Sequence, residues 1–304
     1  MITVLSGGVG AARLLRVLAA HVPATDLTAV VNVGDDFCLH GLTICPDLDT
    51  VTYTLAGRHD AAQGWGLLDE SWRVMDELAH LGGATWFRLG DRDLATHLYR
   101  SQRLAEGATK SQVSAEIARA LGVGVRVLPA SDDPIATTLT TAQGELGFQE
   151  YFVQHHHQVP VTAIAYRGAL SAAPGPGVAS AIADADRVVL APSNPLLSLA
   201  PILAVPGVRR ALAARRGPRV AVSPLVGGRA LKGPADRLLE ELGHDPGSRG
   251  VAAVYGDLVD TWVIDEADAR DAADLRAEGF EVRVTSTVMG EPGRDARLAA
   301  AVLA

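Results

Sequence analysis

Short apolar segments recur along the chain at intervals that are typical of an alternating β/α protein. The runs Met1–Leu5 and Leu27–Val33 are almost continuously apolar, as expected for strands that are covered on both faces. Amphipathic segments such as Ala11–Ala20 separate the runs and predict helices. This alternation predicts an α/β fold with a doubly wound, mostly parallel sheet of the Rossmann-like type. Further strands are predicted at residues 85–89, 126–128, 161–166, 188–191, 219–223, 251–255, 261–264 and 280–284.

The middle of the chain departs from this alternation. Residues 94–102 and 110–121 are predicted helices, and a hairpin is predicted around Gln143-Gly144. We therefore expect a single α/β domain over residues 1–304, with an inserted helical and hairpin cap at roughly residues 93–160.

A glycine-rich turn, Ser6-Gly7-Gly8-Val9-Gly10, follows the first strand and precedes the first helix. This layout is typical of a phosphate cradle, because the unpaired amides and the dipole of a helix start attract anions. The turn matches neither common nucleotide pattern: Arg13 stands where G-x-G-x-x-G needs its last glycine, and no Gly-Lys-Ser/Thr follows. The alternative is a tight strand-to-helix turn that binds no ligand.

Four aspartates within 15 residues follow the second predicted strand: Asp35, Asp36, Asp47 and Asp49. Asp35 and Asp36 stand at the carboxyl end of that strand, where ligand sites of such sheets gather. Because Mg²⁺ prefers carboxylates together with phosphate oxygens, the pattern indicates a Mg²⁺ site. The alternative is a solvated loop over residues 37–50, in which Asp49-Thr50 only caps a helix that begins at Val51.

Polar loops also follow other predicted strands. Ser193 and Asn194 are suited to contact a base edge or a phosphate, or else form a simple turn. The loop Gly227–Gly233 carries two cations, which favours phosphate contact over a basic surface turn. Arg88 either pairs with a nearby aspartate or contacts an anion or a ring edge. Together these strand ends predict one cleft for a polyphosphorylated ligand and a second molecule.

The composition narrows the class of partner. The chain has 304 residues, 48% of them hydrophobic, and its net charge of −8 argues against nonspecific binding to nucleic acid or anionic membranes. The two cysteines, Cys38 and Cys45, fit no zinc or redox motif, and no apolar run approaches the roughly 18 residues of a membrane span. We therefore expect a cytoplasmic protein with small-molecule partners, and neither nucleic-acid nor membrane binding.

Six motifs, in this order along nearly the whole chain, resemble the CofD/FbiA family. Its members are the 2-phospho-L-lactate and phosphoenolpyruvate transferases of the biosynthesis of the deazaflavin coenzyme F-420. The motifs are Ser6–Gly10, Asn32–Asp36, Cys45–Thr50, Trp86–Asp93, Ser193–Pro195 and Gly227–Pro234.

The resemblance implies a reaction. A guanosine diphosphate-linked three-carbon acid gives its phospho-acid unit to the ribityl 5′-hydroxyl of the deazaflavin Fo, and GMP leaves. Actinobacterial members use the enolpyruvyl donor and form dehydro-F-420-0, whereas archaeal members use the lactyl donor and form F-420-0. The Ala- and Arg-rich composition favours the actinobacterial type, although no single residue reports which acid is carried.

The resemblance also implies residue roles and a homodimer. Asp35, Asp36 and Asp49 are the candidates for catalysis and for Mg²⁺, with Asp49 contacting the Fo hydroxyls or the metal. Arg88, where archaeal members tend to carry lysine, and Asp91 complete the Fo site. Guanosine and its phosphates would be held by Ser6, Gly7, Gly8, Gly10, Asn32, Ser193, Asn194, Gly227, Gly228 and Lys232.

Two other functions are compatible with parts of the sequence. The glycine turn and Gly34-Asp35-Asp36 also resemble related nucleotide-sugar-binding regulatory proteins without known catalysis, a resemblance that does not extend to residues 86–93. A nicotinamide-dependent oxidoreductase rests on fold analogy alone and is disfavoured by Arg13.

Overall fold

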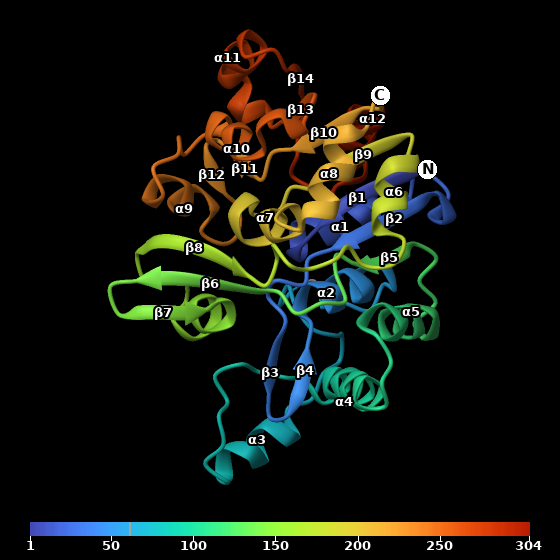
Figure 1. Cartoon of the computed structure of the whole chain (residues 1–304), viewed down its shortest axis with the longest axis vertical. Helices are drawn as coiled ribbons and strands as arrows, with labels where there is room; N and C mark the ends of the chain where they lie inside the picture. Colours follow the sequence, from blue (N-terminus) through green and yellow to red (C-terminus); the bar gives the residue numbers. More distant parts are fainter. Residues whose placement is uncertain (61) are drawn as a thin grey trace.

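The computed structural model describes residues 1–60 and 62–304, and its centre is one seven-stranded parallel sheet (Figure 1). The strands are β1 (Ile2–Ser6), β2 (Leu27–Val31), β5 (Arg126–Pro129), β9 (Arg187–Leu190), β10 (Arg219–Val222), β13 (Thr261–Ile264) and β14 (Glu281–Val284). Their order, β14-β13-β10-β9-β1-β2-β5, runs outward in both directions from β1 and β9. The predicted doubly wound sheet is thus confirmed.

Helices cover the sheet because its strands are apolar on both faces. They are α1 (Gly8–Ala19), α2 (Pro46–Leu55), α6 (Val178–Asp184), α7 (Ala200–Leu203), α8 (Pro206–Ala214), α9 (Ala235–Glu241), α10 (Ser248–Tyr255), α11 (Ala272–Ala277) and α12 (Pro292–Leu303). α1 packs against α2 and α12, and α6 packs against α8. Short helical turns lie at residues 24–26, 150–154, 195–199, 256–258 and 266–271.

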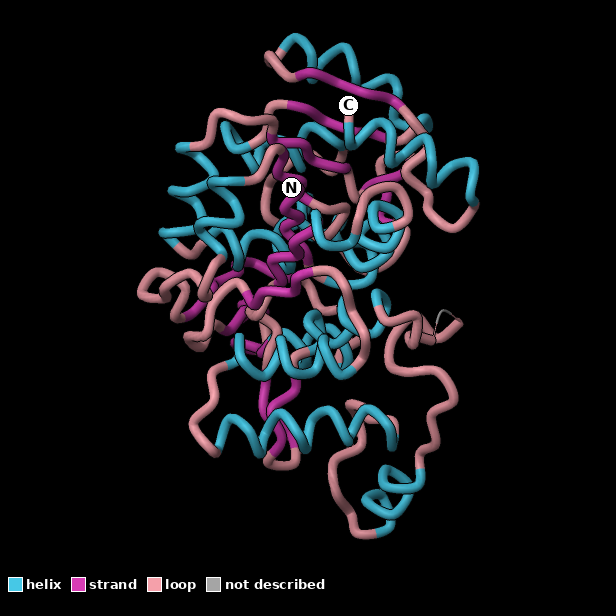
Figure 2. The backbone as a smooth tube through the Cα atoms, turned by 90° about the vertical axis from the view of Figure 1, so that its right-hand side faces the viewer, coloured by secondary structure: helices cyan, strands magenta, loops and turns pink. Residues whose placement is uncertain are grey.

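Two insertions interrupt the alternation. The first, between β2 and β5, projects below the sheet in Figures 1 and 2 and contains, besides α2, β3 (Phe37–Leu39), β4 (Leu42–Ile44), α3 (Arg73–His80), α4 (Asp91–Ala105) and α5 (Lys110–Ala120). The second is an antiparallel sheet of order β7-β6-β8, built from β6 (Ala136–Thr141), β7 (Gly144–Gly147) and β8 (Val161–Arg167). Within the predicted cap at residues 93–160, β5 belongs to the central sheet.

No single helix in the described part of the chain is long and apolar enough to cross a membrane. Pro195–Leu203 and Pro206–Ala214 reach that length and composition only as a pair bent by 86°.

Several predicted elements are wrong, each because a short apolar run does not specify its own conformation. Residues 85–89 form no strand; instead the Phe87 ring packs against Phe37, with 4.9 Å between ring centroids. Residues 251–255 are the end of α10, and residues 161–166 pair with β6 rather than with the central sheet. Residues 37–50, predicted as a loop, contain the β3–β4 hairpin and the first half of α2.

The turn after β1 lies at the point where the strand order reverses, beside the turn after β9. The Ser193 hydroxyl donates to the carbonyl oxygen of Gly7 at 2.7 Å. A Cβ atom on Gly10 would overlap the carbonyl oxygen of Pro192. In open α/β sheets, this crevice at the carboxyl ends of the strands is where ligands bind.

This close approach makes Gly10 a stability determinant. We expect Gly10→Ala to lower the free energy of unfolding by about 2 kcal/mol, because the methyl group must push α1 away from the β9 turn. Urea unfolding followed by circular dichroism measures the loss. Gly293→Ala at the start of α12 is the matched control, since a Cβ atom there meets no atom within 4 Å. Equal stability of the two variants would contradict the close packing.

Candidate active site

The amide of Gly8, at the start of α1, is paired with a carboxylate of the chain itself. The Gly8 N–H donates to Oδ1 of Asp47 at 2.6 Å, and Gly8 has a φ of +70°, a conformation that favours glycine. Asp47 lies in the first turn of α2, because this helix begins at Pro46 and not at Val51 as predicted. A carboxylate therefore takes the amide at which the sequence predicted a phosphate.

Asn32 joins this carboxylate to the end of the second strand. Its Nδ2 donates to Oδ2 of Asp47 at 3.0 Å and to Oδ1 of Asp35 at 3.4 Å. Its Oδ1 accepts from the Gly34 N–H at 2.8 Å, which fixes the orientation of the amide. Asn32, predicted to contact the nucleotide, thus bridges two buried carboxylates.

The pair Asp35–Asp47 carries negative charge that the chain does not neutralise. Burial, and then the charge of Asp47, raises the pKa of Asp35 well above its usual range. Burial also raises the pKa of Asp47 to about 6, against the hydrogen bonds from Asn32 and Gly8. Among residues 1–60 and 62–304, no Lys, Arg or His forms a salt bridge with either carboxylate. Two adjacent buried carboxylates of this kind fit a divalent cation that completes its shell with phosphate oxygens.

Asp36, by contrast, has a cation. Lys110, at the start of α5, places its Nζ 2.5 Å from Oδ2 of Asp36. Burial raises the pKa of the Asp36 carboxyl, and the lysine opposes that shift. Both residues line a cleft of about 680 Å³ between the β3–β4 hairpin, α5 and the segment Pro134–Ala136.

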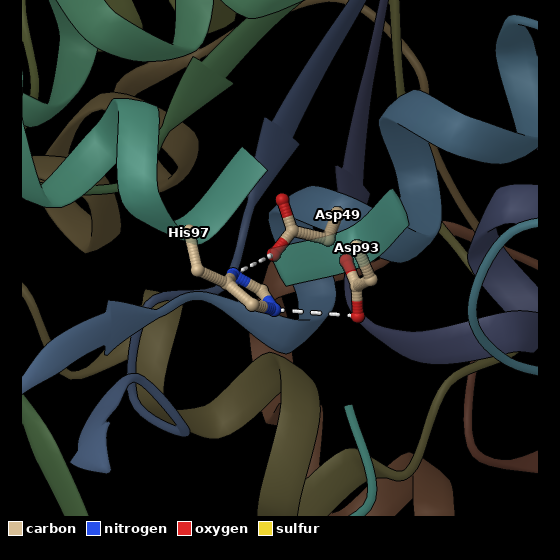
Figure 3. Close-up of side chains that lie close together, drawn as sticks. All are labelled: Asp49, Asp93 and His97. Carbon is tan, nitrogen blue, oxygen red and sulfur yellow. Dashed lines mark ion pairs between the residues drawn. The ribbon is translucent and has the colours of Figure 1, made fainter. Parts of the chain in front are cut away.

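Asp49 also has a cation of its own. Both of its oxygens contact Arg100 of α4, with 3.1 Å between Oδ2 and Nη1. Figure 3 shows His97 between Asp49 and Asp93, with its Nε2 3.3 Å from Oδ2 of Asp93. One ligand atom from each of these three residues lies within 4.8 Å of the others, a spacing that suits a metal. The Arg100 guanidinium, 3.2 Å from Nδ1 of His97, already supplies the positive charge there and disfavours a second cation.

The two remaining residues of the predicted Fo site lie at the start of α4. Asp91 caps α3: its Oδ2 accepts from the Ser71 hydroxyl at 2.5 Å, and its Oδ1 accepts from the Val74 N–H at 3.2 Å. The Ser71 contact lowers the pKa of Asp91. Arg88 is exposed, and its guanidinium carbon lies 4.1 Å from the centre of the Trp72 ring. Of these two residues, Arg88 is the one that presents hydrogen-bond donors to solvent.

Most of the predicted nucleotide ligands make contacts within the chain. Ser6 is fully buried and donates to the carbonyl oxygen of Val4. The Asn194 Oδ1 accepts from the amides of Leu196 and Leu197 at 3.0 Å each. A Cβ atom on Gly7 would come within 2.7 Å of Ser198, so close packing explains that glycine without a ligand.

The second glycine loop is a hairpin turn between β11 (Leu225–Val226) and β12 (Arg229–Ala230). Gly227 and Gly228 both have positive φ, and their amides donate to Asp268 at 2.9 and 2.6 Å. These conformations are the ones that a two-residue hairpin turn requires of glycine. The exposed Lys232 approaches Gly64, so this loop and the α2–α3 loop meet.

Sequence reasoning did not single out His97, Arg100 or Lys110, and it grouped Asp47 with the clustered aspartates without naming it as a metal ligand. One signal for Asp47 was present: proline is common at the first position of a helix, so Pro46 marks the start of α2. Asp93, His97 and Arg100 are spaced four and three residues apart, which places them on one face of α4. No local pattern indicates that this face meets α2.

Comparisons with known proteins identify the family of the chain. The sequence profile described as "2-phospho-L-lactate transferase CofD" matches residues 2–293. A phosphoenolpyruvate transferase of Kitasatospora aureofaciens is 45% identical over 310 residues, covering 100% of this chain and 97% of that protein. Its counterpart in Thermobifida fusca is 44% identical, covering 99% and 96%, and that in Mycolicibacterium smegmatis is 42% identical, covering 99% and 97%.

A crystal structure of a UPF0052 family member from Bacillus halodurans superposes with a TM-score of 0.67 at 18% identity. The superposition covers 100% of this chain and 98% of the Bacillus halodurans chain, so the two proteins share the same α/β fold.

The fold and the site define a Rossmann-like α/β protein whose carboxylates gather at the carboxyl ends of the strands. The chain belongs to the CofD family and is a transferase. The predicted family membership is confirmed.

The raised pKa of Asp47 makes stability depend on pH. A carboxyl whose folded pKa is about 6, above its ordinary value of 3.8, stabilises the fold while it is protonated. That contribution is complete below about pH 4 and is lost as the pH rises through about 6. Without divalent ions, the free energy of unfolding should therefore fall between pH 4 and 7.5 in the wild type by about 2.4 kcal/mol more than it falls in Asp47→Asn.

Urea unfolding in EDTA at the two pH values measures this difference. The asparagine keeps an oxygen acceptor for the Gly8 amide, so the variant should fold. Parallel pH profiles for the two proteins would show that folding does not raise the pKa of Asp47.

Proposed function

We propose that the protein transfers a phosphoenolpyruvyl group from a guanosine diphosphate-linked donor to the ribityl 5′-hydroxyl of Fo, forming dehydro-F-420-0 and releasing GMP. The printed names of the relatives support the enolpyruvyl group over the 2-phospho-L-lactyl group. Fo and the guanosine donor come from the motifs shared with the family.

One observation carries the proposal: a buried carboxylate pair without a cation lies at the strand ends, beside the turn that follows β1. When ionised, Asp35 and Asp47 are acceptors only, so they cannot bind a diphosphate directly. Mg²⁺ held by the pair would link the carboxylates to the donor phosphates and offset negative charge on the phosphoryl oxygens. The site is therefore suited to an anionic substrate despite the acidic composition of the chain.

On the donor side, the chain's own residues fix the orientation of the carboxylate pair. Asn32 and the Gly8 amide hold Asp47, and Asn32 also holds Asp35, in fixed orientations. In the reaction, the Fo hydroxyl oxygen bonds to the phosphorus next to the enolpyruvyl group, and the bond from that phosphorus to the bridging oxygen breaks. The hydroxyl proton passes to solvent or a basic group, and GMP leaves with the electron pair. No covalent enzyme intermediate is required.

The acceptor side is assigned to Arg88 and Asp49. The Trp72 ring holds the Arg88 guanidinium in place, and its N–H groups would donate to a hydrogen-bonding edge of Fo. Asp49, in α2, is buried and held by Arg100, and we assign it to the acceptor side from the family motif. Lys232, in the exposed loop after β12, is the cation that we assign to the donor's nucleotide end.

The direct test is a reaction of the purified protein with Fo, Mg²⁺ and either the enolpyruvyl or the lactyl donor. We expect stoichiometric GMP and a product with the mass of dehydro-F-420-0. Formation of F-420-0 alone would identify the lactyl donor instead. Donor binding without turnover, and without a change in Fo fluorescence, would support the nucleotide-sugar-binding regulator.

Asp47→Asn should separate catalysis from folding. We expect kcat/KM to fall at least about a hundredfold, a loss of about 3 kcal/mol, because one charge of the metal pair is removed. The Mg²⁺ concentration for half-maximal rate should rise in parallel. Asp26→Asn is the matched control and should keep wild-type rates, because Asp26 is exposed and lies at the amino end of β2, opposite the strand end that carries the site. Full activity of Asp47→Asn would remove the pair from the reaction.

Arg88→Ala should act on the acceptor alone. We expect the KM for Fo to rise about tenfold, the equivalent of about 1.4 kcal/mol, with the KM for the donor unchanged. Fluorescence titration of Fo checks the binding step independently of turnover. An unchanged affinity for Fo would place Arg88 outside the acceptor site.

The homodimer also stays a proposal, which light scattering of the purified protein tests.

A further inference from the structure

Five buried side chains connect α2 to α4 in a closed set of contacts, the α2–α4 ring. Its members are Asp49, Tyr53, Asp93, His97 and Arg100, and each exposes 8% or less of its surface. Arg100 holds both oxygens of Asp49 and donates to Nδ1 of His97 at 3.2 Å. His97 faces Asp93 at 3.3 Å, and the Tyr53 hydroxyl donates to Oδ1 of Asp93 at 2.7 Å, which returns the ring to α2.

The ring is an unusual way to join two helices. Apolar side chains would hold α2 against α4 without the desolvation of two carboxylates and a guanidinium. Charged partners, in contrast, hold only one relative placement, because a shifted helix leaves a buried charge unpaired. The ring therefore sets the position of α4 along α2 more narrowly than apolar packing would.

The two helices carry opposite halves of the proposed reaction. Asp47 of the carboxylate pair lies two residues before Asp49 in the first turn of α2. Arg88 lies three residues before the start of α4, where the segment 70–73 and the helix start cap each other through Glu70 and Asp91. A change in the α2–α4 ring would therefore change the distance between the Asp35–Asp47 pair and Arg88.

We infer that Arg100 and His97 are positioning residues for the transfer reaction: through Asp49, they hold the acceptor side of the site at reacting distance from the Asp35–Asp47 pair. Neither residue touches substrate in this role. The inference rests on the proposed function, since it requires one substrate on each side of the α2–α4 contact.

A positioning role predicts a loss in kcat rather than in substrate binding. In Arg100→Lys the charge stays but the two-pronged contact with Asp49 is lost, so we expect kcat to fall about tenfold or more while each KM changes less than about threefold. His97→Leu should behave similarly. His97→Gln should recover most of kcat, because an amide both accepts from Arg100 and donates to Asp93.

Arg103→Lys is the matched control. Arg103 lies three residues further along α4, where it pairs with Glu106 and Glu116 at the surface, and its substitution should leave kcat unchanged. Circular dichroism confirms folding, and the Mg²⁺ concentration for half-maximal rate should stay at the wild-type value in all variants. Tyr53→Phe removes one hydrogen bond and no charge, so it tests the ring even if the Arg100 and His97 variants do not fold; we expect its kcat to fall about threefold.

The outcomes separate this inference from the proposed function. Wild-type protein that neither binds Fo nor turns over the donor would overturn both. An active wild type with unchanged kcat in Arg100→Lys, His97→Leu and Tyr53→Phe, or with losses confined to KM, would overturn the positioning role alone. Failure of His97→Gln to exceed His97→Leu would count against His97.

Discussion

The contact between the Asp47 carboxylate and the Gly8 amide sets the geometry of the site. It joins the first turns of α1 and α2, and Asn32 extends the same contact to the end of β2. The turn after β9 also packs against the start of α1. Gly10 lies against Pro192, and Ser193 donates a hydrogen bond to Gly7. Three strand ends therefore meet around one carboxylate. The Asp47 carboxylate cannot move without disturbing α1. The glycines of this turn therefore have a structural role, because the Gly8 amide is bonded to Asp47.

Charge is distributed unevenly around this contact. The insertion between β2 and β5 supplies two cations, the partly buried Lys110 from α5 and the buried Arg100 from α4, which neutralise Asp36 and Asp49. Asp35 and Asp47 are left as the uncompensated pair, and burial with mutual repulsion raises the pKa of Asp35. The insertion thus affects the chemistry of the site. Because its cations pair with Asp36 and Asp49, only Asp35 and Asp47 of the four aspartates remain available to a metal cation.

The parts of the fold that the sequence predicted well are those with a strong local signal. Continuous apolar runs followed by amphipathic helices identified β1, β2, β9, β10, β13 and β14. The β3–β4 hairpin was missed because its strands are three residues long, and residues 251–255 were mistaken for a strand because a buried helix end is equally apolar. The motifs fall at or beside the strand ends, and most of the polar residues within them bond to the chain itself.

By itself, the sequence determined the alternating α/β sheet, the family, and the concentration of aspartates after the second strand, because apolar periodicity and motif order are local properties of the chain. Only the tertiary structure decided which aspartates share a site. Asp36 and Lys110 are 74 residues apart, and Asp49 and Arg100 are 51 apart. No spacing rule relates residues so distant, since their pairing depends on how the inserted helices pack against α2. The physical reason is that a buried carboxylate takes its charge state from whichever cation the fold brings within contact distance.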